Sequence, residues 1–278
     1  MRLVTVRTKD GTRAGRLDGE TIELLPFPDV GALLTQTDWG AVVEQNRGEE
    51  IAAADADLAP VVPTPNKIIC LGLNYRAHIE EMGRDLPTHP TLFAKYAVSL
   101  IGARDLIVLP PESQAVDWEV ELAFVIGARA RRVKRDDAAS VVAGFTVLND
   151  ISMRDWQMRT LQFLQGKTFE KSTPVGPAVV TLDELPGGIE ADLPISCEVD
   201  GEQMQKARTS DLLFPPAELV EYISTIMTLE PGDIVATGTP NGVGAGRNPP
   251  VFLKPGQTVR TTIEGVGELV NPTVAEAV

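Results

Sequence analysis

The chain has few of the residues on which several common enzyme classes depend. Among its 278 residues there are only two histidines, His78 and His89, and two cysteines, Cys70 and Cys197. Two histidines exclude a histidine-rich zinc site, and cysteines this far apart lack the close spacing of a disulfide framework or a zinc site. We therefore expect both cysteines to be buried free thiols, and carboxylates and lysines to carry any chemistry.

Positive charge is also scarce, with 25 lysines and arginines against 39 acidic residues and a formal net charge of −14. This excess of negative charge repels phosphate backbones and anionic lipids, so nucleic acid and membrane surfaces are poor partners. No apolar run approaches the roughly 18 residues of a spanning helix, and charged residues interrupt the N-terminus before any signal-like stretch. The composition predicts a cytoplasmic protein.

The first part of the chain predicts a small β-containing domain. Apolar and polar residues alternate over residues 2–25, and Asp-Gly pairs punctuate them as hairpin turns do. Residues 29–36 and 40–54 have a helical pattern. Three prolines then fall within residues 59–66, which is typical of a stiff, extended linker. We therefore predict an N-terminal domain over residues 1–62.

Strands dominate the remainder, residues 63–278, which we predict to be the catalytic domain. Apolar runs separated by proline or glycine turns predict strands at 67–73, 106–109, 118–126, 144–148, 178–181, 195–199, 233–237 and 258–264. One amphipathic helix is predicted from 216 to 229. Most connections are too short for crossover helices, so the pattern favours a β-rich α+β fold over a doubly wound array.

An acidic segment carries the clearest chemical signal. In a strand, Asp117, Glu119 and Glu121 share one face, and the continuously apolar residues that follow indicate that the strand enters the core. Buried carboxylates must be paired, protonated or bound to a metal. Together with Glu119 and Glu121, Asp150 at the end of another predicted strand makes a set of three carboxylates, and such an oxygen set suits Mg²⁺ or Mn²⁺. A solvated acidic strand face is the alternative.

Two further features are compatible with catalysis. His78 and Glu81 lie three residues apart in a predicted helix over 74–82, where the carboxylate can orient the imidazole as a general base. Lys167 can provide a cation for a substrate carboxylate or a developing oxyanion. The alternatives are a solvated histidine and a surface lysine. The glycine and proline content of residues 83–95 suggests a loop that closes over the site.

Together these segments resemble the fumarylacetoacetate hydrolase family over about residues 65–275. The matching motifs occur in the family's order along the chain: Leu73-Asn-Tyr75 with His78, Glu119-Val-Glu121, Leu148-Asn-Asp150 with Ser152 and Arg154-Asp155, Gly166-Lys167 in a segment that ends at Pro174-Val-Gly-Pro177, and Thr237-Gly-Thr-Pro. The short N-terminal β-region is similar to the small domain appended in that family. The resemblance implies a mixed β-sandwich roll and a homodimer.

The resemblance also implies roles for individual residues. The implied metal ligands are Glu119, Glu121 and Asp150, holding Mg²⁺ or Mn²⁺; His78 with Glu81 would activate water; Lys167 would contact the reacting oxygen; Thr239 would line the substrate carboxylate site; and Arg154 and Gln157 would add polar contacts. His89 has no implied role and is expected to be structural.

One departure from the family narrows the expected substrate. The larger tyrosine-catabolic members carry a fourth acidic ligand seven residues before the histidine, where this chain has Leu71. This favours the short acylpyruvase-like branch, and hence hydrolysis of a carbon-carbon bond in a 2,4-dioxo acid such as an acylpyruvate or fumarylpyruvate, in aromatic or small-acid catabolism. The alternatives are oxaloacetate decarboxylation, isomerisation of a 2-hydroxyhepta-2,4-diene-1,7-dioate, and a non-catalytic cation-binding scaffold.

Overall fold

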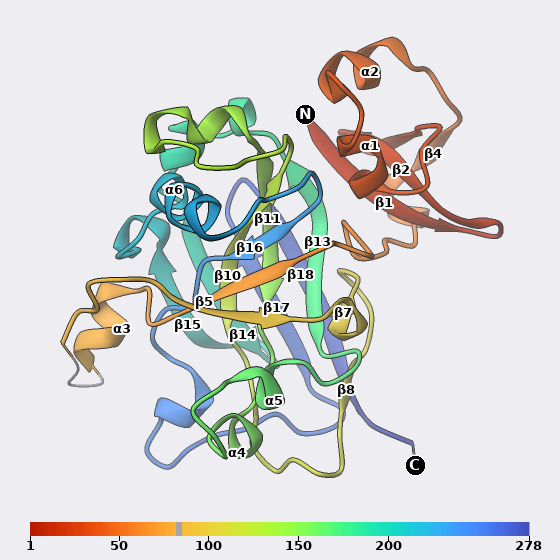
Figure 1. The fold of residues 1–278 in the computed structure, drawn as a ribbon. Coiled ribbons are helices and arrows are strands. Elements are labelled where there is room, and N and C mark those ends of the chain that lie inside the picture. The colour runs from red at the N-terminus through yellow and green to blue at the C-terminus, as the bar shows by residue number, and fades with distance from the viewer. Residues whose placement is uncertain (82–84, 278) are drawn as a thin grey trace.

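The computed structural model describes residues 1–81 and 85–277 of the chain, apart from the side chains of His78 and Glu81. Its largest sheet has eleven strands, and Figure 1 shows that the sheet runs through the whole molecule. Across the sheet the path is β4 (Glu50–Ala52), β3 (Thr21–Leu24), β2 (Gly11–Asp18), β1 (Arg2–Thr8), β13 (Thr173–Val180), β11 (Val142–Asn149), β10 (Val120–Ile126), β16 (Ile234–Ala236), β5 (Ile68–Gly72) and β6 (Thr91–Lys95), with β7 (Leu100–Ile101) beside β13.

A second sheet packs against the first. Its order is β15 (Glu202–Arg208), β14 (Pro194–Val199), β17 (Thr258–Ile263), β18 (Gly267–Ala275) and β8 (Ile107–Leu109). Two short strands, β9 (Val116–Asp117) and β12 (Ser152–Met153), pair separately. The helices are α1 (Val30–Leu34), α2 (Trp39–Gln45), α3 (Arg76–Glu81), α4 (Arg154–Gln157), α5 (Leu164–Lys167) and α6 (Pro216–Ile226). The predicted β-rich α+β sandwich is confirmed.

Side chains of β10 alternate between two cores, as the period of a strand requires. Leu122 and Phe124 join the core between the two sheets, where Ile195 and Ile263 of the second sheet also lie. Ala123 and the other side chains on the opposite face of β10 join a second core, which includes the buried side of α1. Because both faces of β10 are covered, every residue of this strand is buried.

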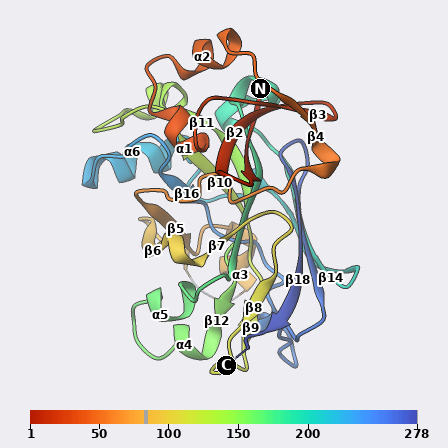
Figure 2. The ribbon, with the colours of Figure 1, turned by 90° about the vertical axis from the view of Figure 1, so that its right-hand side faces the viewer.

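The N-terminal meander is confirmed, but it is joined to the main sheet. Strand β1 pairs with β13, with Leu3 opposite Val179, so the first strands extend the large sheet at one edge. Figures 1 and 2 both place them at the end of the molecule away from α4 and α5. The prediction of a helix over 40–54 is wrong beyond Gln45, because Ile51 pairs with Ile22 as part of β4. The division at residue 62 stays a prediction.

Other predictions can be compared directly with the structure. Helix α6 buries Leu219 and Ile223 as its amphipathic pattern predicts. Cys70 and Cys197 are buried free thiols, and burial raises the pKa of both. Residues 83–95 are not one loop, since the last five form β6 against β5, while residues 82–84 lie outside the described residues. Within the described ranges, none of the helices combines the length and apolar character that a membrane crossing requires.

Candidate metal centre and active site

The three predicted carboxylates converge where β10 and β11 lie side by side. Asp150 follows the last residue of β11, and its backbone N–H donates to the Glu119 carbonyl over 2.9 Å. The Glu119 N–H donates in turn to the side chain of Asn149, also over 2.9 Å. The first of these bonds continues the antiparallel ladder beyond Val120, the first residue of β10. As a result, oxygen atoms of Glu119, Glu121 and Asp150 lie within 4.8 Å of one another, and all three residues are buried.

Three cationic side chains surround this group of carboxylates. Lys167 Nζ lies 2.6 Å from Glu119 Oε2 and 2.8 Å from Asp150 Oδ2. Lys95 Nζ lies 2.6 Å from the other Asp150 oxygen, and both members of that pair are completely buried. Arg154 Nη1 lies 2.6 Å from Glu119 Oε1. Buried charges are tolerated only when they are paired, and here Glu119 and Asp150 are paired through both of their oxygens.

The same contacts set the protonation states of the site. Burial by itself would raise the pKa of Asp150, but the ammonium groups of Lys167 and Lys95 lower it below its usual value. Burial would likewise lower the pKa of Lys167, yet Asp150 and Glu119 raise it. Glu121 differs, because burial and the charges of Asp150 and Glu119 raise its pKa well above its ordinary value. Lys167 is therefore a cation and Asp150 an anion, whereas Glu121 is the carboxylate whose charge is least compensated.

Glu121 also shows where a cation would bind. Its Oε2 accepts a hydrogen bond from the Gly238 N–H over 2.8 Å, whereas its Oε1 is buried and has no partner within the described part of the chain. Gly238 has φ +91°, which favours glycine, and a Cβ there would come within 3.2 Å of the Leu71 carbonyl. An unpartnered buried oxygen is costly unless a ligand satisfies it. Three convergent carboxylates, one of them unsatisfied, fit a hard divalent cation.

The predicted substrate-binding residues lie beside this centre. They differ in whether a hydrogen-bonding group is left without a partner in the described structure. Gln157 is buried and its Oε1 accepts from Arg154 Nη1 over 3.0 Å, while Nη2 of Arg154 is buried without a partner among the described residues. The hydroxyl of Thr239 donates to the Val120 carbonyl over 2.9 Å and accepts from Gln205 Nε2 over 2.9 Å. Among the described residues, Arg154 therefore keeps a donor without a partner, whereas the Thr239 hydroxyl both donates and accepts within the protein.

The predicted base lies only partly within the described structure. His78 and Glu81 both fall in α3, which confirms the helix, but their side chains lie outside the described residues. Their roles as base and orienting group therefore stay predictions. The other histidine, His89, stacks on Tyr222 with ring centroids 6.4 Å apart. That contact is compatible with the structural role expected for it.

Sequence reasoning missed one residue of the site, Lys95, and the main contact of another, Asp117. Lys95 ends β6, where its ammonium group reaches Asp150 from the strand beyond β5. Nothing in the local sequence distinguishes it from a surface lysine, although the apolar strand before it is a weak signal of burial. Asp117 was recognised as part of the acidic segment, but its bond to Arg154, 2.8 Å from Oδ2 to Nε, depends on a contact between β9 and α4.

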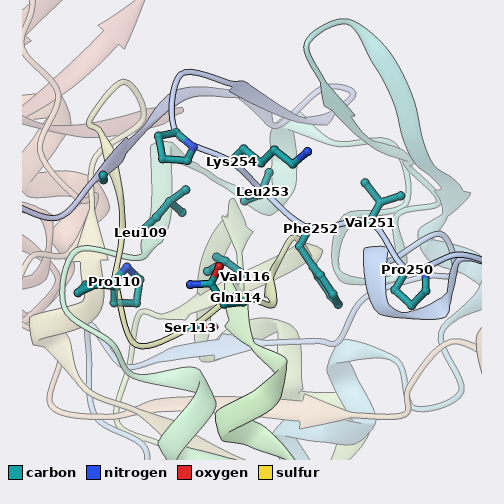
Figure 3. Close-up of a pocket in the computed structure, with 13 residues that line it drawn as sticks. Leu109, Pro110, Ser113, Gln114, Val116, Pro250, Val251, Phe252, Leu253 and Lys254 are labelled. Carbon is teal, nitrogen blue, oxygen red and sulfur yellow. The ribbon is translucent and has the colours of Figure 1, made fainter.

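An open pocket lies apart from the carboxylates. It has a volume of about 510 Å³ and is lined by six residues from the segment 109–116, by residues 250–255 and by Ala275. Figure 3 shows side chains from these two segments, among them Pro110 and Phe252, facing the space between them. The lining includes none of the three convergent carboxylates and neither of the buried lysines, so this pocket does not define the reaction centre.

Fold and site together define a β-rich enzyme scaffold built around a buried carboxylate cluster. The sequence model of the fumarylacetoacetate (FAA) hydrolase C-terminal domain matches residues 67–274, which is most of the chain. The chain therefore belongs to the fumarylacetoacetate hydrolase family, whose members include metal-dependent enzymes. The resemblance seen in the motifs is confirmed over nearly the range on which it was based.

Known relatives cover several activities. The mitochondrial oxaloacetate tautomerase FAHD2A of Bos taurus is 49% identical over 219 residues, which are 78% of this chain and 69% of the relative. The crystal structure of 5-carboxymethyl-2-hydroxymuconate delta-isomerase from Mycobacterium smegmatis matches with a TM-score of 0.82 and 34% identity over all of both chains. Maleylpyruvate hydrolase from Sphingobium sp. SYK-6 matches with a TM-score of 0.81 and 31% identity over 99% of this chain and 100% of that one.

Proposed function

We propose that this chain is a metal-dependent enzyme that forms and reprotonates the enolate of a 2-oxo dicarboxylic acid, with oxaloacetate as the substrate. The observation that carries the proposal is the buried cluster of Glu119, Glu121 and Asp150. Glu121 Oε1 has no partner among the described residues, whereas two lysines and an arginine pair with the other two carboxylates. The similarity to an oxaloacetate tautomerase supports the choice of substrate. It also moves that substrate ahead of the acylpyruvates favoured by the sequence alone.

The site supplies the chemistry that such a reaction needs. A divalent cation held by Glu119, Glu121 and Asp150 would act as a Lewis acid toward a carboxylate and an adjacent 2-oxo oxygen. Lys167 is held in its charged form by its acidic neighbours, so it stabilises negative charge that develops on the substrate oxygen. The free Nη2 of Arg154 donates to a substrate carboxylate. Proton removal is assigned to His78, oriented by Glu81, as the sequence predicts.

A second candidate is hydrolysis of a carbon-carbon bond in a 2,4-dioxo acid. The match to a maleylpyruvate hydrolase supports it, and the same carboxylate cluster would serve it. This reaction differs in one requirement, because a water molecule must be deprotonated and delivered to the second carbonyl. In both reactions the enolate is stabilised in the same place. The homodimer, the cytoplasmic location and the catabolic pathway stay predictions of the sequence.

Purified protein with Mg²⁺ and three substrates separates these reactions. With oxaloacetate we expect faster decay of the enol absorbance without release of pyruvate, and EDTA should abolish it. Release of pyruvate and carbon dioxide would show that the protein decarboxylates oxaloacetate and does not tautomerise it. Turnover of an acylpyruvate without any effect on oxaloacetate would make hydrolysis the function.

A pair of matched variants assigns the activity to this site. Lys167→Met should lower turnover at least about 100-fold, since it removes a preorganised charge beside the reacting oxygen. Lys206→Met, on the exposed face of β15, should leave turnover unchanged. Equal loss in both variants, or in neither, would place the reaction elsewhere.

A further inference from the structure

Asp117 is a completely buried acidic residue to which neither the sequence analysis nor the proposed function assigns a role. It ends β9, opposite Ser152 of β12, two residues before Glu119. Both of its oxygens are fully engaged. Oδ1 accepts from the N–H groups of Trp118 (2.8 Å) and Gly244 (2.6 Å), and Oδ2 accepts from the N–H of Ala245 (3.0 Å) and from Arg154 Nε (2.8 Å).

These four bonds show that Asp117 does not act as a fourth metal ligand. A carboxylate offers about four lone-pair positions, and all of them are used. Three of the donors belong to the backbone, so the orientation of the carboxylate is fixed by main chain rather than by mobile side chains. Gly244 is fitted closely to this arrangement, because a Cβ there would meet Asp117 Oδ1 at 2.8 Å and the Val251 carbonyl oxygen closer still. Among the described residues, Arg154 is the only side chain that donates to Asp117.

Arg154 is held at two of its three nitrogen atoms. Nε binds Asp117, and Nη1 binds Glu119 over 2.6 Å and Gln157 over 3.0 Å. A guanidinium group is planar and rigid, so two fixed nitrogens fix the direction of the third. That third nitrogen, Nη2, is buried without a partner in the described part of the chain. A buried charged donor left in this way is costly, which points to an acceptor supplied by a ligand.

We propose that Asp117 is a positioning residue that holds the Arg154 guanidinium in the plane in which Nη2 donates to an anionic oxygen of the bound 2-oxo acid. The nature of that ligand rests on the proposed function. Because its acceptor positions are already used, Asp117 does not bind the ligand itself. Its role is to connect the backbone of Gly244 and Ala245 to Arg154, which contacts Glu119.

The test compares Asp117→Asn with Asp155→Asn in the protein loaded with Mg²⁺, with oxalate as the probe. Asparagine has nearly the same size but replaces one acceptor oxygen with a donor, so it cannot satisfy all four N–H groups. We expect at least about tenfold weaker oxalate binding by calorimetry, the effect of losing a hydrogen bond to a charged group. The KM for substrate should rise in parallel, with kcat within about threefold.

Asp155 is the matched control because it is the neighbour of Arg154 in sequence and also accepts from a side chain and from backbone. Its carboxylate binds the Ser113 hydroxyl over 2.7 Å and the Trp156 N–H over 3.1 Å. We expect Asp155→Asn to change oxalate affinity less than twofold. If Asp117→Asn does not fold, Asp117→Ser keeps one acceptor oxygen and leaves room for water.

A double-mutant cycle separates positioning from general structural support. Lysine at position 154 cannot reproduce the fork of a guanidinium group, so in the Arg154→Lys background Asp117→Asn should weaken oxalate binding less than twofold further. Independent losses that multiply in the double variant would overturn the inference, as would wild-type affinity in Asp117→Asn. If oxalate binds and the cycle shows coupling, but no substrate is turned over, only the proposed function would be refuted. Wild-type protein that does not bind oxalate would refute both.

Discussion

The two ends of the β10–β11 hairpin are equally buried but are stabilised in opposite ways. At one end Phe124 lies opposite Phe145, and burial of apolar area stabilises the pair without any partner of defined geometry. At the other end Glu121 lies opposite Leu148, and the carboxylates there require a lysine or a backbone N–H at a defined distance. The same pair of strands therefore has one end that needs only apolar burial and another end that needs polar partners at defined distances.

The difference lies in what each end contributes to function. Charges that are buried with incomplete pairing destabilise a fold, and proteins keep them where a ligand completes the set. Glu121 Oε1 is such an incomplete position, whereas the apolar end has no unsatisfied group in its strand pairs. We therefore expect substitutions at the charged end to change activity most, and substitutions at the apolar end to change stability alone.

The largest effect is expected for Glu121→Gln. Removing the charge that a cation needs should lower turnover at least about 1,000-fold and abolish stabilisation by added Mg²⁺. The amide keeps an acceptor for the Gly238 N–H and places a donor near Asp150, so the metal-free protein should melt at the same or a higher temperature. Calorimetry with and without Mg²⁺ measures both effects. A variant that retains Mg²⁺-dependent stabilisation would show that Glu121 is not a ligand.

The next effect concerns stability at the charged end. Lys167→Met leaves Glu119 and Asp150 without their shared cation, which should lower the free energy of unfolding in EDTA by about 3–5 kcal/mol. Mg²⁺ should restore part of this loss, because a divalent cation compensates the same carboxylates. Denaturant titration of wild type, Lys167→Met and the exposed Lys206→Met gives the comparison. An equal loss with and without Mg²⁺ would show that Mg²⁺ does not compensate the carboxylates that Lys167 pairs with.

A smaller effect is expected at the apolar end. Phe124→Leu should lower the free energy of unfolding by about 1 kcal/mol, because it removes apolar volume from a closely packed core. Oxalate affinity in the presence of Mg²⁺ should stay within twofold of wild type. A large loss of affinity would show that the two ends of the hairpin are energetically coupled and that the contrast between them is too simple.

The smallest effect is expected at the surface. Arg129 and Glu230 form an ion pair of 3.2 Å, but both side chains are exposed, at 68% and 38%. Arg129→Ala should change the free energy of unfolding by at most about 0.5 kcal/mol, since water and salt screen such pairs. The measurement calibrates the buried pairs by showing what a similar contact contributes without burial.

Several predictions from the sequence depended only on local patterns, and these agree with the structure. Alternation predicted the N-terminal meander, the apolar period predicted α6, and the acidic spacing followed by an apolar strand predicted that Glu119 and Glu121 lie at the edge of the core. The helix over 40–54 was wrong because residues 50–52 pair with β3, which a local pattern does not reveal. The structure of that segment is determined by its pairing with a strand that is distant in the sequence.

What the sequence determined by itself is the β-rich fold, the family and the three carboxylates, because strand periodicity and short motifs are local properties of the chain. Only the tertiary structure decided which cations face those carboxylates. Lys95 of β6 reaches Asp150, which follows β11, although three strands lie between β6 and β11 in the sheet. Asp117 meets Arg154 through a contact between β9 and α4. Charge pairing across such distances in sequence depends on how the strands are ordered in the sheet. Local patterns along the chain do not reveal that order.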